Sequence, residues 1–480
     1  MSLDSHRWRT QALPRVLWIE LTSRCPFDCV FCTRKALRGA GEHMDFALYQ
    51  RLVGEAGRPQ IIRLNYAGES GHYPQLAEAV ALAAATGATV ELVTALASLK
   101  AERLRAALDA GLTRLTVSLH TLDPARFQAI YRFGTWPAMH QRLHEVLQWR
   151  AQCARPFALD LAFVAMRQNL DELPAVAAYA QSLGIDVLAV HPLIGRDPLP
   201  LGQASEHDPG GRMASSFRAQ LAAAVGQARA VAPAVDVQLS SHELAEACAL
   251  DESPQPWPWP LPTGARIAAC DQSPFETAHI LSDGRVVACE VTEKLTLGNL
   301  QTQSLREIWH GLVYRQFRQD HAVGAHPACA GCIYKSAYFP GAATARLDGA
   351  HAPPMQFLRG WHPDDGSGLR WSEASAAFWL PAPGNQRQLR LQGILAEQRP
   401  VPGNGFHVRI NGQAAYHETC PRAGERDLLL PLPGDHRADD PVFVEIDCTH
   451  AASPLQLQCG ADVRVLGFGL ISAEIQPSCH

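Results

Sequence analysis

The chain has 480 residues, of which 47% are hydrophobic and 19% charged, with a net charge of −5. This length gives a prior of about three domains, and the apolar fraction can fill their cores. The mildly negative charge argues against a nucleic-acid-binding surface. No apolar run reaches the roughly 18 residues of a membrane-spanning helix, and no signal peptide is expected. The 13 cysteines predict metal ligands and free thiols in a reducing cytoplasm.

The first part of the chain, from residue 16 to about residue 192, alternates two kinds of pattern. Apolar and β-branched runs predict strands at 16–22, 60–66, 88–94, 114–119, 158–165 and 186–191. Several of the helical stretches between them end at a glycine, as at Gly87, Gly111 and Gly184, where a C-cap is expected. Strands spaced by such helices predict parallel βαβ units and an α/β fold.

Cys25, Cys29 and Cys32 follow the first expected strand with the spacing C-x3-C-x2-C. A loop this short can place three thiolates at three corners of a cubane iron–sulfur cluster. Because no fourth cysteine lies near, one iron would stay open to a ligand from solution. Structural zinc is the alternative, but a closed zinc site takes four ligands, usually as two separated pairs. We therefore favour the cluster.

This cysteine motif resembles the signature of the radical S-adenosylmethionine (SAM) superfamily, C-x3-C-x-aromatic-C, with Phe31 as the aromatic residue. The resemblance implies a partial (β/α)6 barrel and a [4Fe–4S] cluster whose open iron binds SAM. It also implies that SAM is cleaved to a 5′-deoxyadenosyl radical, which abstracts hydrogen from the substrate. A one-electron reductant such as flavodoxin or ferredoxin is the implied partner. Phe31 would contact the adenine, and core packing is its alternative role.

Two loops after later strands are similar to further motifs of this family. Ala67, Gly68 and Glu69 resemble its Gly-Gly-Glu loop, with Ala67 in place of the first glycine. In the family this loop hydrogen-bonds the amino group of SAM through backbone carbonyls. Ser118 matches a serine that approaches the ribose or carboxylate of SAM, and His120 replaces the aspartate that usually follows.

The loops after the fifth and sixth expected strands add two candidate residues. Arg167 resembles an arginine that could pair with the SAM carboxylate; a surface arginine near a helix start is the alternative. His191 ends the sixth strand, where a histidine can accept a proton near neutral pH. We predict His191 as the catalytic base, with His120 and Glu276 next, and structural hydrogen bonding at the strand end as the alternative.

A second cysteine constellation follows, with Cys270 and Cys289 apart and Cys329 and Cys332 as a C-x2-C pair. Residues 281–289 predict a β-hairpin with an Asp-Gly turn. The order of these cysteines and the hairpin resembles the SPASM/twitch module of radical SAM enzymes. No further cysteines follow soon after the pair, so the single-cluster twitch form fits best, with one auxiliary [4Fe–4S] cluster. Zinc is again the alternative, since four cysteines can close either site.

Positions 355–480 contain short strand-like runs between turn residues and predict a β-sandwich or jelly roll. The runs are 376–380, 389–391, 406–410, 427–432, 442–446 and 466–472. The expected domains are thus a barrel at 1–235, a cluster domain at 236–345 and the sandwich at 355–480. The last module resembles accessory modules of glycan-assembly proteins. We therefore expect a cytoplasmic radical SAM enzyme that oxidises or epimerises a small molecule, a sugar or a sugar-containing metabolite. Modification of a ribosomally made peptide is the alternative, and binding or electron transfer without turnover is another.

Overall fold

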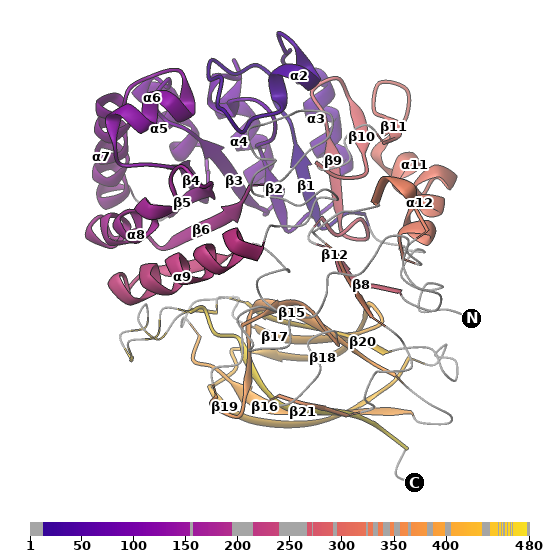
Figure 1. The fold of residues 1–480 in the computed structure, drawn as a ribbon. Coiled ribbons are helices and arrows are strands. Elements are labelled where there is room, and N and C mark those ends of the chain that lie inside the picture. The colour runs from indigo at the N-terminus through magenta and orange to yellow at the C-terminus, as the bar shows by residue number, and fades with distance from the viewer. Residues whose placement is uncertain are drawn as a thin grey trace.

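Figure 1 presents the computed structural model of the chain, in which a mixed α/β part stacks on an all-β part. The structure describes residues 13–153, 157–193, 215–239, 266–270, 272–290, 295–322, 325–329, 335–338, 346–349, 356–362, 366–381, 387–398, 405–433, 442–449 and parts of 451–477.

The α/β part is built on parallel strands that pair in chain order. These strands are β1 (Val16–Ile19), β2 (Ile61–Arg63), β3 (Thr89–Thr94), β4 (Arg114–Ser118), β5 (Ala158–Ala165) and β6 (Val187–Pro192). The helices of this part are α2 (Arg34–Arg38), α3 (Phe46–Glu55), α4 (Leu76–Ala85), α5 (Ala101–Asp109), α6 (Pro124–Tyr131), α7 (Trp136–Gln152), α8 (Leu173–Ser182) and α9 (Ser215–Val231). The α/β prediction is confirmed, and all three predicted cap glycines have left-handed φ.

The same sheet extends beyond the predicted strands at both edges. β7 (Asp236–Leu239) pairs parallel to β6, and β9 (Thr277–Ile280) pairs parallel to β1. β10 (Arg285–Val287) pairs antiparallel with β9 across the Asp283-Gly284 turn, which confirms the predicted hairpin, and β11 (Thr296–Asn299) pairs antiparallel with β10. The turn of this hairpin needs Gly284, whose φ is +85°. β7 starts at the first residue of the predicted cluster domain; the domain boundaries remain predictions.

Two helices follow the hairpin in the chain, and a separate small sheet is formed by strands before and after it. α11 (Leu305–Trp309) begins with a capping box between Ser304 and Glu307, and α12 (Leu312–Ala322) follows it. β8 (Arg266–Cys270) and β12 (Lys335–Tyr338) form a separate two-stranded antiparallel sheet.

The all-β part forms two antiparallel layers with an apolar core between them (Figure 1), as predicted. One long strand belongs to both layers, because Arg370 and Trp371 pair with one neighbour while residues 375–380 pair with another. The strands are β13 (Arg346–Asp348), β14 (Phe357–Trp361), β15 (Arg370–Leu380), β16 (Gln388–Leu395), β17 (Gly405–Ile410), β18 (Gln413–Thr419), β19 (Gly424–Pro431), β20 (Val442–Thr449) and β21 (Phe468–Gln476). β13, β14 and β18 were not predicted.

One arginine connects the two parts. The Arg15 guanidinium, just before β1, lies 2.9 Å from a carboxylate oxygen of Glu445 on β20 and 3.4 Å from one of Glu276, just before β9. Arg15 therefore joins the amino-terminal end of the parallel sheet to the outer face of one sandwich layer. Within the described residues, every helix is too short or too polar to cross a membrane.

The core of the sandwich predicts the outcome of a cavity-forming substitution. Phe406 is fully buried and stacks on Phe468 with ring centroids 5.4 Å apart. Phe406→Ala should lower the free energy of unfolding by about 3–5 kcal/mol, measured by denaturant titration. Leu429→Ala is the control, because this side chain is 56% exposed, and its effect should stay within about 0.5 kcal/mol. Equal effects of the two substitutions would contradict the assigned core.

Candidate active site

The three cysteines of the first motif lie on the loop between β1 and α2. The Cys32 amide donates a hydrogen bond to the Cys29 carbonyl at 3.0 Å. The Val30 amide donates one to the carbonyl of Ile130, near the end of α6, also at 3.0 Å. None of the three cysteines is in a disulfide, and all three are partly buried. Burial, followed by the negative charge of Glu69, raises the pKa of Cys25 to about 12, and burial also raises that of Cys29. Two neighbouring thiols this hard to ionise fit a site whose thiolates are neutralised by bound iron.

The predicted cluster does not need a site in which several side chains hold one metal ion. In the part of the chain that the structure describes, no three His, Cys, Asp or Glu side chains converge to hold one metal ion. A cubane does not require such convergence, since each thiolate binds a different iron. The donor set therefore fits the predicted [4Fe–4S] cluster.

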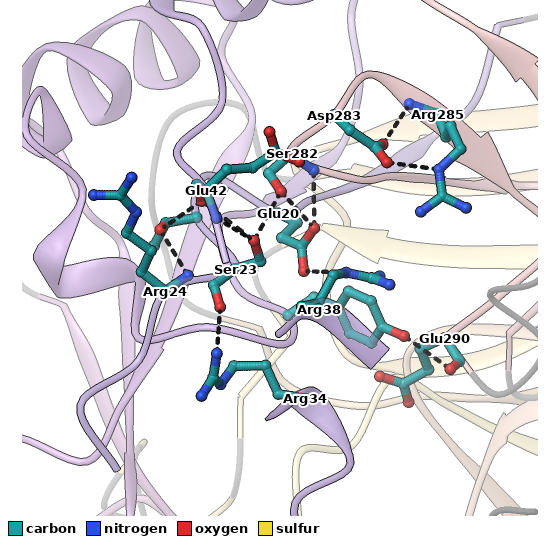
Figure 2. Close-up of polar contacts among 12 residues, drawn as sticks. Glu20, Ser23, Arg24, Arg34, Arg38, Glu42, Ser282, Asp283, Arg285 and Glu290 are labelled. Carbon is teal, nitrogen blue, oxygen red and sulfur yellow. Dashed lines mark hydrogen bonds and ion pairs between the residues drawn. The ribbon is translucent and has the colours of Figure 1, made fainter. Parts of the chain in front are cut away.

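A buried carboxylate anchors this loop to the hairpin (Figure 2). Glu20, directly after β1, is fully buried and accepts hydrogen bonds from the amide (2.8 Å) and hydroxyl (3.0 Å) of Ser282. Its other oxygen lies 3.5 Å from the Arg38 guanidinium on α2. The Ser282 hydroxyl also bonds the Ser23 hydroxyl at 3.2 Å. Glu20 thus ties the helix after the cysteine loop to the β9–β10 turn.

The predicted SAM loop after β2 is tightly constrained. The Glu69 amide donates to the Arg24 carbonyl at 2.9 Å, beside the cysteine loop. The buried Glu69 carboxylate accepts from the Ala95 amide at 2.9 Å, which joins the loops after β2 and β3. A Cβ on Gly68 would lie 2.1 Å from the Thr22 carbonyl oxygen, so only glycine fits there. Ala67 adopts a φ of +47°, which is uncommon for a residue other than glycine.

Tyr66, which begins this loop, reaches the second cysteine constellation. Its φ is +127°, a region that side chains rarely adopt. Its hydroxyl donates a hydrogen bond to the backbone carbonyl of Glu290 at 2.9 Å. Glu290 directly follows Cys289, so one side chain spans the two predicted cofactor loops.

His120 is held in the wall of the site by its neighbours. It is 2% exposed, stacks on Tyr131 (ring centroids 5.2 Å apart) and meets Phe31 edge to face at 5.0 Å. Its Nδ1 accepts a hydrogen bond from the Val164 amide at 3.1 Å. Burial, and then the charge of His191, lowers the pKa of His120 to about 3. These contacts occupy the Nδ1 lone pair and support a packing role for His120.

The remaining predicted residues lie at the same end of the sheet. The carbonyl of Ser118, at the end of β4, accepts a hydrogen bond from Tyr131 at 2.7 Å. Arg167 is exposed, and its guanidinium carbon lies 5.4 Å from the ring centroid of Phe217 on α9. His191 is exposed near the end of β6, opposite Val164 of β5. The structure therefore brings these side chains to one edge, as predicted for parallel strands.

The second constellation is described for three of its four cysteines. Cys270 ends β8, Cys289 follows β10, and Cys329 ends a short 3-10 turn. Cys270 and Cys289 are partly buried and Cys329 is buried. Cys332 lies outside the described residues. The segments that follow the first two cysteines meet where the Gln272 amide donates to the Glu290 carboxylate at 3.4 Å.

Comparison with known proteins identifies both cysteine regions. The family model of the radical SAM superfamily matches residues 19–147, and the SPASM model, an iron–sulfur cluster-binding domain, matches residues 270–333. The chain carries a radical SAM domain and a SPASM domain. These domains imply SAM and two [4Fe–4S] clusters as cofactors, as predicted. The narrower twitch form remains a prediction.

Individual relatives match parts of the chain. A PqqA peptide cyclase of Rhodopseudomonas palustris is 28% identical over 183 residues, covering 38% of this chain and 47% of the relative. GTP 3′,8-cyclase 1 of Pseudomonas aeruginosa is 32% identical over 201 residues, or 39% of this chain and 55% of the relative. A PqqA peptide cyclase of Xanthomonas campestris pv. campestris is 26% identical over 314 residues, or 64% and 76%. The chain thus spans about half the length of the first two curated relatives.

Among solved structures, SuiB of Streptococcus suis bound to S-adenosylmethionine matches 64% of this chain and 68% of its own, with 12% identity and a TM-score of 0.49. The similarity to peptide cyclases gives no support to the predicted sugar substrate.

Sequence reasoning missed three residues that join the two domains, namely Glu20, Tyr66 and Ser282. Glu20 carried one usable signal, because an acidic residue breaks an otherwise apolar strand run directly before the cysteines. Tyr66 and Ser282 carried none. Their partners lie more than 200 residues away, since Tyr66 bonds Glu290 and Ser282 bonds Glu20.

The close approach of Gly68 to the radical SAM cysteine loop can be tested by adding one methyl group. Gly68→Ala should lower the free energy of unfolding by about 1–3 kcal/mol through overpacking, measured by denaturant titration, and should weaken SAM binding. Gly226→Ala is the matched control, because a Cβ there meets nothing within 4 Å. In the interior of α9 that change should stabilise by roughly 0.5–1 kcal/mol. A neutral Gly68→Ala variant would contradict the described loop packing.

The buried His120 predicts a specific dependence of stability on pH. Its pKa is about 3 in the folded chain but about 6.5 when unfolded. Below pH 6.5 the unfolded chain therefore binds a proton that the folded chain does not. The stability from His120 is present above that pH and falls by about 1.4 kcal/mol per unit as pH drops toward the folded pKa. Denaturant titrations between about pH 6.5 and 5 should show that the free energy of unfolding falls less steeply with decreasing pH in His120→Gln than in the unchanged chain. Equal slopes for the two proteins would refute the lowered pKa of His120.

Proposed function

We propose that this chain is a radical SAM enzyme that modifies a peptide substrate by hydrogen abstraction. The observation that carries the proposal is the similarity to PqqA peptide cyclases, which in one case covers 64% of the chain. A match of that length extends beyond the radical SAM region into the SPASM region. The peptide substrate thus replaces the sugar that we expected from the C-terminal module.

Each cofactor would be held by residues already described. Cys25, Cys29 and Cys32 would bind the radical SAM cluster, and the loop of Ala67, Gly68 and Glu69 would receive the amino group of SAM. When bound, the clusters and SAM supply a radical that abstracts hydrogen and an acceptor for one electron. Gly68 keeps the SAM loop against the cysteine loop, because its missing side chain allows contact with the Thr22 backbone.

Phe31, Ser118 and Arg167 would complete the SAM pocket. Phe31 is partly exposed beside the buried His120, which fits a ring that covers an adenine. Arg167 is exposed at the same edge and can pair with a carboxylate. His120 serves as the packed support behind Phe31.

His191 is the proposed proton acceptor. Closing a ring in a peptide breaks two bonds to hydrogen, on carbon or a heteroatom, and forms one bond between the two atoms. One hydrogen leaves as an atom, and the other leaves as a proton and an electron. His191 is exposed at the strand end that faces the SAM loops, and a histidine can accept that proton near neutral pH. His120 is less suited, because its Nδ1 already accepts the Val164 amide.

The proposal is tested first on SAM cleavage. The triple variant Cys25→Ala, Cys29→Ala, Cys32→Ala should yield no 5′-deoxyadenosine after anaerobic reconstitution and reduction, because it lacks three cluster ligands. The control replaces Cys153, Cys420 and Cys459, which lie outside both constellations and form no disulfide, and should keep full cleavage. Undiminished cleavage by the first variant would end the radical SAM assignment.

The substrate class needs a second assay. Short synthetic peptides and saccharides, each deuterated at one position in turn, are incubated with the reduced enzyme and SAM. Transfer of deuterium into 5′-deoxyadenosine, with loss of two hydrogens from the peptide, is expected. His191→Ala should keep both clusters and uncoupled SAM cleavage but lose the product. Transfer from a saccharide but from no peptide would overturn the peptide assignment.

A further inference from the structure

We propose that His321 donates a hydrogen bond to the auxiliary-cluster ligand Cys329 and thereby raises the reduction potential of that cluster. His321 would be a positioning residue that acts through the cysteine. The proposal rests on the second cluster and does not depend on the substrate.

The geometry places His321 against the cysteine from a different element. His321 lies in the last turn of α12, and its Nδ1 is 3.5 Å from the Sγ of Cys329. The two side chains are only 3% and 8% exposed. Water therefore competes little for this contact.

The ring of His321 is held by aromatic neighbours. Phe317, one turn earlier on α12, lies 5.8 Å from it between ring centroids, and Phe275 lies 6.2 Å away. Phe317 also contacts His326, just before the turn that carries Cys329. The imidazole is thus fixed beside the sulfur by packing on two sides.

The direction of the hydrogen bond follows from the chemistry of the ligand. A cysteine bound to iron is a thiolate, which has no proton to donate and can only accept. The imidazole must therefore present Nδ1–H to the sulfur. Such a bond withdraws electron density from the thiolate and favours the more negative, reduced cluster. Hydrogen bonds to cluster sulfurs are one of the protein's means of setting the potential.

The same contact could instead mean that His321 is itself a ligand in place of Cys332. The two roles differ in what a substitution removes. A ligand change releases iron, whereas loss of a hydrogen bond leaves the cluster intact and changes its potential.

The test uses the full chain with Cys25, Cys29 and Cys32 replaced by alanine, so that only the auxiliary cluster remains. Iron content and an EPR-monitored redox titration are measured for His321→Phe, His321→Gln and Cys332→Ala, with the exposed His144→Phe as control. We expect full iron and a lower potential for His321→Phe. The shift should be smaller for His321→Gln, whose amide can still donate, and absent for His144→Phe. Cys332→Ala should lose iron.

Three outcomes would overturn the proposal. The first is an unchanged potential in His321→Phe with full iron. The second is loss of iron in both His321 variants, which would make His321 a ligand. The third is absence of a cluster in the parent chain. If only His321→Phe fails to fold or to bind iron, the potential of His321→Gln decides: a value below the parent supports the hydrogen bond, and an equal value refutes it.

Discussion

The buried carboxylate of Glu20 fixes the cysteine loop relative to the β9–β10 hairpin, and both predicted cluster sites depend on that placement. Glu20 is fully buried and the Arg38 side chain is 10% exposed. Removal of one partner from such a pair typically costs about 3–5 kcal/mol, because it leaves an uncompensated charge. The two hydrogen bonds from Ser282 satisfy the remaining oxygen. These polar contacts therefore act together with the pairing of β1 and β9 and with a shared apolar core to set the relative position of the two domains.

The cysteine motifs and the parallel strands could be predicted from the sequence because their signals are local. Three ligands lie within eight residues, and each strand is a run of apolar or β-branched residues within a short window. Tyr66 and His321 could not be predicted. Each acts through a contact that only the tertiary fold creates, and neither residue type is unusual at its place. Positive φ at Tyr66 is likewise invisible in the sequence, since tyrosine is not a turn-forming residue.

The strands of the sandwich could also be predicted only in part from the sequence. Its apolar strands were predicted from short β-branched and apolar runs, but β18 was missed because most of its residues are exposed or half-buried and no apolar face marks it. The pairing of β15 with two layers depends on where the strand bends, which no periodicity reveals. The sugar expectation rested on the resemblance of this module and on the single-cluster form of the auxiliary domain. The likeness to one peptide cyclase instead extends over 64% of the chain.

The place of β1 in the sheet has a consequence for synthesis of the chain. β1 pairs with β2 on one side and with β9, more than 250 residues later, on the other. At roughly 5–20 residues per second, β9 leaves the ribosome on the order of tens of seconds after β1. During that interval the edge of β1 and the adjoining cysteine loop stay open. Insertion of iron and sulfur can therefore precede closure of the sheet, and premature pairing of this edge is the hazard that the nascent chain must avoid.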